Sequence, residues 1–256
     1  MGLFSACVNC SEEVEDKKSR TAPIPTLTPE AQLETTHKSL RLGDTVPNFS
    51  AETTNGNIDF HTYKEGKWAI LFSHPEDFTP VCTTELGAVA KLSNEWEKRD
   101  TKVIGLSCNT LESHERWIAD INETQNADVK FPIIADANRK VAQLFDMLDF
   151  QDETNVDKKG MPLTVRSVFI IAPNNIIRLI ITYPASCGRN FDEVLRVLDS
   201  LQLGDKHKIA TPVNWKNGDD VIIPPSIKNE EADKLFPGYK VIKPYLRTVN
   251  VGVLEH

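Results

Sequence analysis

The chain has 256 residues, of which 40% are hydrophobic and 26% charged, and its formal net charge is −8. These values fit a soluble globular protein with one full domain and an appendage, and they argue against a nucleic-acid partner because no basic patch is evident. No apolar run approaches the roughly 18 residues of a membrane span, and the N-terminus lacks the apolar core of a secretory signal.

The five cysteines are an odd number with irregular spacing. A secreted disulfide framework normally uses an even set of cysteines in a short chain, so this pattern favours a reducing compartment. We therefore expect a cytoplasmic location.

Residues 1–41 are charged and rich in proline and threonine, and we expect a flexible arm. Gly2 follows the first methionine as in N-myristoylated proteins, although Ala6 stands where serine or threonine is usual. Cys7 and Cys10 offer sites for palmitoylation, and two acyl chains would give a stable membrane anchor. The sequence leaves open whether the arm is acylated or unmodified. Cys7 and Cys10 also form a C-x-x-C motif. A redox pair would be expected at a strand–helix junction, and a zinc site would need further ligands nearby; neither is present, which argues against both.

Regular patterns begin near Leu42. The segment 55–57 (Asn-Gly-Asn) is typical of a hairpin turn, and alternation predicts a strand over 58–63. The next expected elements are a strand over 68–73, a helix over 80–98, a strand over 102–107, a helix from an Asn109 N-cap to about residue 124, a strand over 131–136 and a helix over 138–147.

A polar loop over 148–162 precedes two strands, 165–172 and 176–183, and a helix over 190–202. Strands that alternate with helices predict an α/β domain over 42–203, with a central sheet flanked by helices. Residues 204–256 are interrupted by prolines and carry only one short helical stretch, about 229–236. We expect these residues to form a proline-rich arm without a core of its own.

The segment 74–85 joins an apolar strand to the helix over 80–98. Pro80 fits the first position of a helix, where its missing N–H costs nothing. Cys82 would then lie in the first turn, beside unpaired backbone N–H groups and the positive end of the helix dipole, which favours a thiolate over a thiol. A buried structural cysteine is the alternative.

Pro75, Thr79 and Cys82 resemble the Pro-x-x-x-Thr-x-x-Cys motif of peroxiredoxins. Segments 210–215 and 235–238 are similar to the C-terminal arm of the 1-Cys subfamily, so the resemblance covers roughly residues 42–250. It implies a thioredoxin-like fold with a mixed sheet, a homodimer, and thiol-dependent reduction of hydrogen peroxide and of organic or lipid hydroperoxides. It implies neither a cofactor nor a metal.

The resemblance also assigns roles to single residues. Cys82 is the nucleophile, and Arg166 is the cation that stabilises the thiolate and the departing oxygen. Thr79 orients the peroxide, and Pro75 shields the pocket from water. Three further residues match family positions that line or support the pocket or supply a second cation: His74, Glu85 and Arg189.

Oxidised Cys82 would be a sulfenic acid, which a second thiol must reduce. No cysteine follows Cys187, so the resolving cysteine of two-cysteine relatives is missing. Cys108 ends an apolar strand and is expected to be a core residue, and we do not expect Cys187 to resolve Cys82. The expected reductant is an external thiol: glutathione, with or without a glutathione transferase, or thioredoxin. A peroxide sensor or holdase chaperone is the alternative function.

Some 1-Cys peroxiredoxins are also credited with phospholipase A2 activity through a serine, a histidine and an aspartate. In this chain His61 is present, but Lys67 replaces the serine and Asn174 replaces the aspartate. Because no activated hydroxyl remains, we expect no lipase activity at this place.

Overall fold

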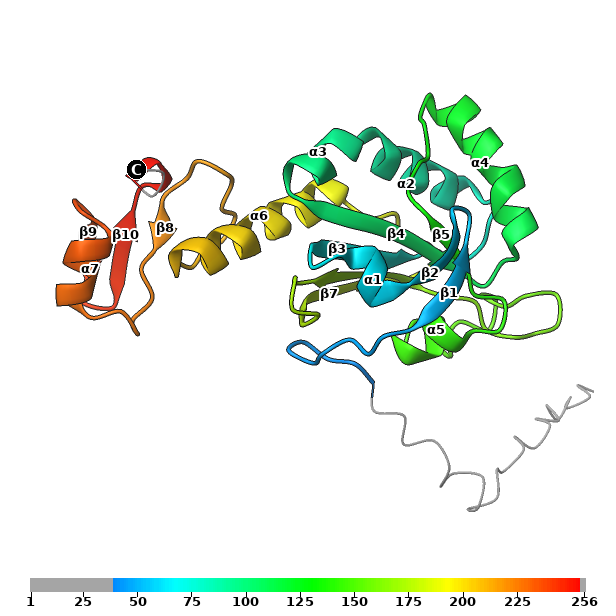
Figure 1. The fold of residues 1–256 in the computed structure, drawn as a ribbon, viewed down its shortest axis with the longest axis horizontal. Coiled ribbons are helices and arrows are strands. Elements are labelled where there is room, and N and C mark those ends of the chain that lie inside the picture. The colour runs from blue at the N-terminus through cyan, green and yellow to red at the C-terminus, as the bar shows by residue number, and fades with distance from the viewer. Residues whose placement is uncertain (1–38, 254–256) are drawn as a thin grey trace, which may run out of the picture. The chain divides into compact units, whose positions relative to one another are not determined.

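A computed structural model of the chain describes residues 39–253. They form a seven-stranded sheet in the order β2-β1-β5-β4-β3-β6-β7 and a three-stranded sheet in the order β8-β10-β9 (Figure 1). Strands β3, β4 and β5 are parallel, whereas β1, β6 and β7 pair in antiparallel fashion, so the predicted mixed sheet is confirmed. The strands of the larger sheet are β1 (Ser50–Thr53), β2 (Gly56–Asp59), β3 (Trp68–Ser73), β4 (Thr101–Ser107), β5 (Ile133–Ala135), β6 (Arg166–Ile171) and β7 (Ile177–Tyr183).

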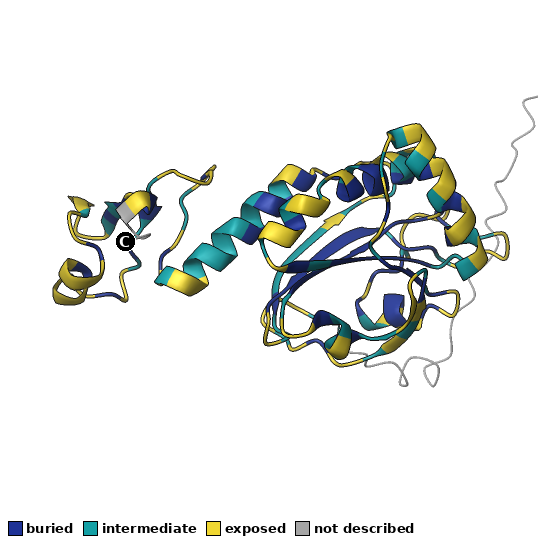
Figure 2. Ribbon diagram, turned by 45° about the horizontal axis from the view of Figure 1, so that its top comes forward, coloured by how far each residue is buried: buried dark blue, intermediate teal, exposed yellow. Residues whose placement is uncertain are grey.

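Helices cover both faces of the seven-stranded sheet. They are α1 (Phe60–Lys64), α2 (Pro80–Lys91), α3 (Ser93–Lys98), α4 (Leu111–Gln125), α5 (Lys140–Leu144) and α6 (Phe191–His207). Alternate residues of one strand serve opposite faces: Ile70 and Phe72 of β3 pack with α2, α3, α4 and α6, whereas Ala69 and Leu71 pack with α1 and α5. The central strands are buried on both faces, as Figure 2 shows in dark blue.

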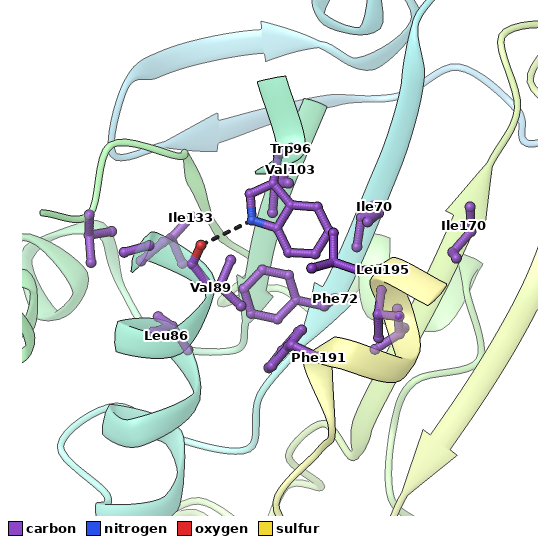
Figure 3. Packing of buried hydrophobic residues seen from close by; sticks show 14 of the residues in the cluster. Ile70, Phe72, Leu86, Val89, Trp96, Val103, Ile133, Ile170, Phe191 and Leu195 are labelled. Atoms are coloured by element: carbon purple, nitrogen blue, oxygen red, sulfur yellow. Dashed lines mark hydrogen bonds between the residues drawn. The ribbon is translucent and has the colours of Figure 1, made fainter. Parts of the chain in front are cut away.

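Each face of the sheet carries a hydrophobic core, and the core beneath α2 and α6 is the larger one. Phe72 lies edge-on to Phe191 of α6, with ring centroids 5.9 Å apart (Figure 3). Trp96 of α3 closes the same cluster, and its Nε1 donates to the carbonyl of Val89, 3.0 Å away. Gly87 lets α2 approach α4 closely, because an added Cβ would lie 2.5 Å from the side chain of Gln125. The buried side chains of Leu86, Val89 and Ala90 therefore anchor the second half of α2 in this core.

Three local expectations were wrong in detail. The alternation over 58–63 is overridden at Asp59, whose Oδ1 accepts from the backbone N–H of Thr62 at 3.1 Å and caps α1. The expected helix over 80–98 is interrupted at Leu92, so that α2 and α3 are separate. The N-cap of α4 is Thr110 rather than Asn109, since Thr110 Oγ1 accepts from Ser113 N.

The expectation that the C-terminal residues lack a core was also wrong. They contain β8 (Val221–Ile222), α7 (Asn229–Leu235), β9 (Lys240–Lys243), β10 (Leu246–Val249) and a 3₁₀ turn at Val251–Val253. Buried apolar side chains form a cluster of their own there, with Trp215 and Phe236 each 1% exposed. Arg247 Nη2 donates to the carbonyls of Pro224 and Ile227, which ties β10 to the segment before α7. The segment is therefore a small folded unit and not an extended arm.

Among residues 39–253, none of the helices has the length and apolar character that a membrane crossing requires.

Candidate active site

Cys82 lies where the chain passes from the central strand β3 into helix α2. Thr79 is the N-cap residue of α2, in extended conformation, and Pro80 occupies the first turn. The predicted position of Cys82 in that turn is confirmed, and its side chain is fully buried. The first-turn N–H groups of α2 have no helical acceptor, so this position favours negative charge.

Arg166 is the first residue of β6, next to β3 in the sheet. Its Nη1 lies 3.2 Å from the sulfur of Cys82. Its Nε and Nη2 donate to the carbonyl of Ala185 at 2.9 and 2.6 Å, which fixes the plane of the guanidinium. The structure therefore brings together the two residues that the sequence assigned as nucleophile and cation, 84 positions apart.

Glu85, one turn further along α2, holds two arginines at once. Its Oε2 accepts from Arg166 Nη1 and from Arg189 Nη2, both at 2.7 Å. Its Oε1 accepts from the backbone N–H and the Nε of Arg189, at 2.8 and 3.0 Å. Burial opposes the ionisation of this carboxyl, but Arg189 and Arg166 outweigh it and hold the pKa of Glu85 below its usual value. Glu85 therefore stays a carboxylate and orients Arg166 toward Cys82.

Arg189 does not contact the sulfur of Cys82 directly. Its Nη1 donates to the carbonyls of Ser73 and Ser167, at 2.7 and 3.0 Å, and its guanidinium lies over the ring of Phe72. These contacts tie the ends of β3 and β6 to Glu85. The positive charge of Arg189 compensates the carboxylate of Glu85.

Thr79 and Pro75 lie on the wall of a cavity of about 290 Å³ that also reaches Arg166. The hydroxyl of Thr79 donates to the carbonyl of Glu76 at 2.8 Å, so its oxygen remains free to accept a hydrogen bond. Pro75 is buried and closes one side of this space. Cys82 is not among the residues that line the cavity, whereas Arg166 lines it and also contacts the sulfur of Cys82 at 3.2 Å.

A buried network that the sequence did not reveal stands behind this loop. Asp77 accepts from His74 Nε2 and from His114 Nδ1, each at 2.8 Å, and from the hydroxyl of Ser113 at 2.7 Å. Burial opposes the charge of Asp77, but the hydrogen bonds from the two histidines hold its pKa well below the usual range. Burial lowers the pKa of His74, so its ring is neutral at pH 7. Asp77 could have been noticed from its place within segment 74–85, whereas no sequence signal pointed to His114.

Three of these side chains offer ligand atoms within 4.8 Å of one another, close enough to be considered for a metal ion: His74, Asp77 and His114. Their donor atoms, however, already face the carboxylate of Asp77 as N–H···O pairs of ordinary length. His114 Nε2 is also within 3.2 Å of the carbonyl of Ile134. His74 Nδ1 is buried without a hydrogen-bond partner, but His74 Nε2 and His114 Nδ1 are both committed to the carboxylate of Asp77, so this geometry fits an ion poorly.

The remaining cysteines have different environments. Burial raises the pKa of Cys108 to about 12, so this residue is a neutral thiol at pH 7. Cys187 is exposed, and its sulfur lies 3.7 Å from the carbonyl of Gly188. The acylation candidates Gly2, Cys7 and Cys10 lie outside the described residues.

The three positions that correspond to a lipase triad do not form one. His61 Nε2 contacts the carbonyl of Val46 at 3.0 Å, and Lys67 pairs with Asp100 at 2.8 Å. Asn174 Oδ1 accepts from the backbone of Ile176. Within residues 39–253 no hydrogen bond joins any two of His61, Lys67 and Asn174. The absence of lipase activity stays a prediction.

Comparisons with known proteins agree with this geometry. Residues 42–180 match the model of the AhpC/TSA family, and residues 200–238 match the C-terminal domain of 1-Cys peroxiredoxin. The mitochondrial peroxiredoxin PRX1 of Saccharomyces cerevisiae is 54% identical over 209 residues, which are 81% of this chain and 80% of that protein.

Two solved structures are similar as well. Peroxiredoxin 6 of Arenicola marina has a TM-score of 0.79 at 44% identity, covering 83% of this chain and 98% of that one. The yeast mitochondrial 1-Cys peroxiredoxin has a TM-score of 0.75 at 51% identity, covering 82% and 99%. Its structure is described as the basis of thiol resolution via glutathione and thioredoxin systems. The predicted thioredoxin-like fold is confirmed by these neighbours.

One expectation from the sequence is contradicted. The yeast relative at 54% identity is a mitochondrial protein, which points to mitochondria and away from the cytoplasm. The odd cysteine count argued only for a reducing compartment, and such compartments are not limited to the cytoplasm. No finding supports membrane association through an acylated N-terminus.

Proposed function

This chain is a 1-Cys peroxiredoxin of the AhpC/TSA family, a thiol-dependent peroxidase, and we propose that Cys82 is the thiol that the peroxide oxidises. The observation that carries the proposal is the 3.2 Å contact between Cys82 Sγ and Arg166 Nη1. The relatives favour a peroxidase over the sensor or holdase alternative. We assign the chemistry to residues 42–203 and treat residues 204–256 as a C-terminal domain.

In the first step, the thiolate of Cys82 attacks one peroxide oxygen, and the O–O bond breaks. The sulfur is oxidised to a sulfenic acid, and the other oxygen leaves with the electron pair of the broken bond and takes up a proton to become water or an alcohol. Arg166 stabilises the thiolate before the attack and the departing oxygen during it. Thr79 Oγ1, whose proton is committed to Glu76, accepts the hydrogen bond of the peroxide O–H.

In the second step, an external thiol attacks the sulfenic acid, releases water and forms a mixed disulfide with Cys82. A second thiol then displaces Cys82 and restores it. We propose glutathione or thioredoxin as the donor, because the similar yeast protein is described with those two systems. Cys82 is fully buried, so α2 must open at its first turn to admit either donor.

Replacing Arg166 with glutamine should slow the oxidation of Cys82 by about 10²-fold, the usual effect of removing one stabilising donor from the transition state. A single-turnover, stopped-flow measurement with hydrogen peroxide reads this step without involving the reductant.

The matched control is Arg178→Gln. Arg178 also sits on a strand of the sheet and pairs with a carboxylate, Asp205, at 2.6 Å, but it is partly exposed and has no contact with Cys82. Equal oxidation rates in the Arg166 variant and in this control would refute the role of Arg166.

We further propose a homodimer formed through β7, which is an edge strand of the seven-stranded sheet. An exposed edge with apolar side chains pairs readily with a second chain. Leu179 and Ile180 pack partly against the two cores, whereas Ile181 is half-buried and joins neither. A second copy of β7 would cover Ile181.

Ile181→Lys should convert this dimer into a monomer, because two lysines would be buried near the two-fold axis without partners. Sedimentation velocity measures the change. Val213→Lys is the control, since Val213 is 87% exposed and lies away from β7 in the chain. A wild-type monomer, or a dimer that persists in Ile181→Lys, would contradict the proposed interface.

A further inference from the structure

Trp117 of α4 contacts three parts of the segment that carries Cys82. Its indole Nε1 donates to the hydroxyl of Thr83 in the first turn of α2, 3.1 Å away. Its ring lies against the ring of His74, just after β3, with centroids 5.0 Å apart, and the centroid of the Phe78 ring is 6.4 Å away. Residues before and after the start of α2 therefore meet on one buried side chain.

The hydrogen bond from Trp117 is continued into the N-cap of α2. The hydroxyl of Thr83 donates in turn to the carbonyl of Thr79, the N-cap residue, at 2.8 Å. The backbone N–H of Thr83 donates to the same carbonyl at 3.0 Å. If the first turn of α2 unfolds, this carbonyl loses both donors, and the buried indole N–H loses its acceptor. Because an unpaired buried donor is costly, these bonds oppose the opening of the turn.

Helix α4 is itself fixed at the end that faces this segment. Ser113 and His114, in its first turn, donate to Asp77 Oδ2 at 2.7 and 2.8 Å. The guanidinium of Arg116 lies 5.9 Å from the ring centroid of Phe78, whose backbone is left-handed with a φ of 55°. That conformation is unfavourable for a bulky residue, and the ring contacts with α4 help to hold it. The closed first turn of α2 therefore has a rigid support.

We infer that Trp117 is a positioning residue, which keeps the first turn of α2 closed over Cys82 and so limits the access of the thiol donor. The inference rests on the proposed function, in which the fully buried Cys82 must be exposed before a donor can reach its sulfenic acid. The attack on peroxide uses the closed turn, where Arg166 Nη1 lies 3.2 Å from the sulfur. Loss of the bond between Trp117 and Thr83 should therefore affect the two steps of the reaction differently.

The test is Thr83→Val, which removes the acceptor of Trp117 and keeps the shape of the side chain. The backbone amide of residue 83 should exchange with solvent about fivefold faster, as expected for the loss of one hydrogen bond from a closed state. In sequential-mixing stopped flow, the sulfenic acid of Cys82 should react with glutathione faster by the same factor. Its formation by hydrogen peroxide should keep the wild-type rate, because the closed form still predominates.

Thr84→Val is the matched control. The hydroxyl of Thr84 also donates to a carbonyl of the same helix, that of Val81 at 2.7 Å, but Thr84 is exposed and its hydroxyl has no bond to α4. Thr83→Ser restores the hydroxyl and should behave as the wild type. Trp117→Phe removes the donor and should reproduce Thr83→Val, and the double variant should differ little from either one, because both changes break the same bond.

Unchanged exchange or an unchanged reaction with glutathione in Thr83→Val would overturn the inference, as would equal changes in Thr84→Val. An equal rise in exchange at the amide of Gly105, which bonds the carbonyl of Pro132 in the sheet, would also overturn it by showing a general loosening of the domain. None of these results contradicts the proposed function, which instead fails if hydrogen peroxide does not oxidise Cys82 in the wild type.

Discussion

Cys82→Ser is expected to reduce thiol-dependent peroxide consumption by about 10³-fold or more, because a serine hydroxyl is a far weaker nucleophile than a thiolate at neutral pH. The substitution keeps the shape of the side chain at a fully buried position, so the fold should persist. Steady-state peroxide consumption with glutathione or thioredoxin as donor measures the loss, and circular dichroism checks the fold.

The other described cysteines supply matched controls for this result. Burial raises the pKa of Cys108 to about 12, and Cys108 does not line the cavity. Cys187 is exposed, and its sulfur lies near the carbonyl of Gly188 rather than near Arg166. Cys108→Ser and Cys187→Ser should therefore retain most of the turnover. Full turnover in Cys82→Ser, or its loss in Cys187→Ser alone, would contradict the assignment of Cys82.

Glu85→Gln should lower both stability and activity, because it leaves Arg166 and Arg189 without their shared carboxylate. Removing one partner of a buried ion pair typically costs about 3–5 kcal/mol, and Glu85 is 4% exposed. Arg166 would keep its bonds to the carbonyl of Ala185 but lose the group that directs Nη1, so the oxidation of Cys82 should slow as well. Urea unfolding measures the first effect, and single-turnover oxidation measures the second.

The pH dependence of this effect follows from the lowered pKa of Glu85. A carboxyl whose pKa is depressed by folding contributes its full stability above the ordinary glutamate pKa of about 4.3, and loses it as pH falls through the lower folded value. The difference in unfolding free energy between wild type and Glu85→Gln should be constant at neutral pH and shrink only below about pH 4.3.

Glu193→Gln is the matched control for this comparison. Glu193 also bonds an arginine through both oxygens, Arg196 at 2.6 and 2.8 Å, but at a partly exposed position of α6. Exposed pairs contribute about 0–1 kcal/mol. Equal destabilisation of the two variants would contradict the claim that burial makes the ion pairs of Glu85 more important for stability than an exposed pair.

The residues at the strand–helix junction could be predicted because their signals are local. The helix start that places Thr79, Pro80 and Cys82 is determined by residues that are close together in the chain. Arg166 stood out as a charge among apolar strand residues, and the resemblance to a family placed it. The contact between Arg166 and Cys82 needed the sheet order, in which β6 lies beside β3.

The features that could not be predicted from the sequence depend on contacts between residues far apart in the chain. The bond between Asp77 and His114 joins the segment between β3 and α2 to the first turn of α4, and no periodicity marks it. The start of α1 was missed because a single cap at Asp59 outweighed a strand-like alternation. The C-terminal core was missed because Trp215 and Phe236 are scattered between prolines and meet only after folding.

The most direct test is to locate the oxygen atom after one turnover. Reduced protein is mixed with one equivalent of hydrogen peroxide in the presence of dimedone, which traps sulfenic acids, and its peptides are analysed by mass spectrometry. The account predicts the adduct on Cys82. An adduct on Cys108 or Cys187, with Cys82 unmodified, would contradict it.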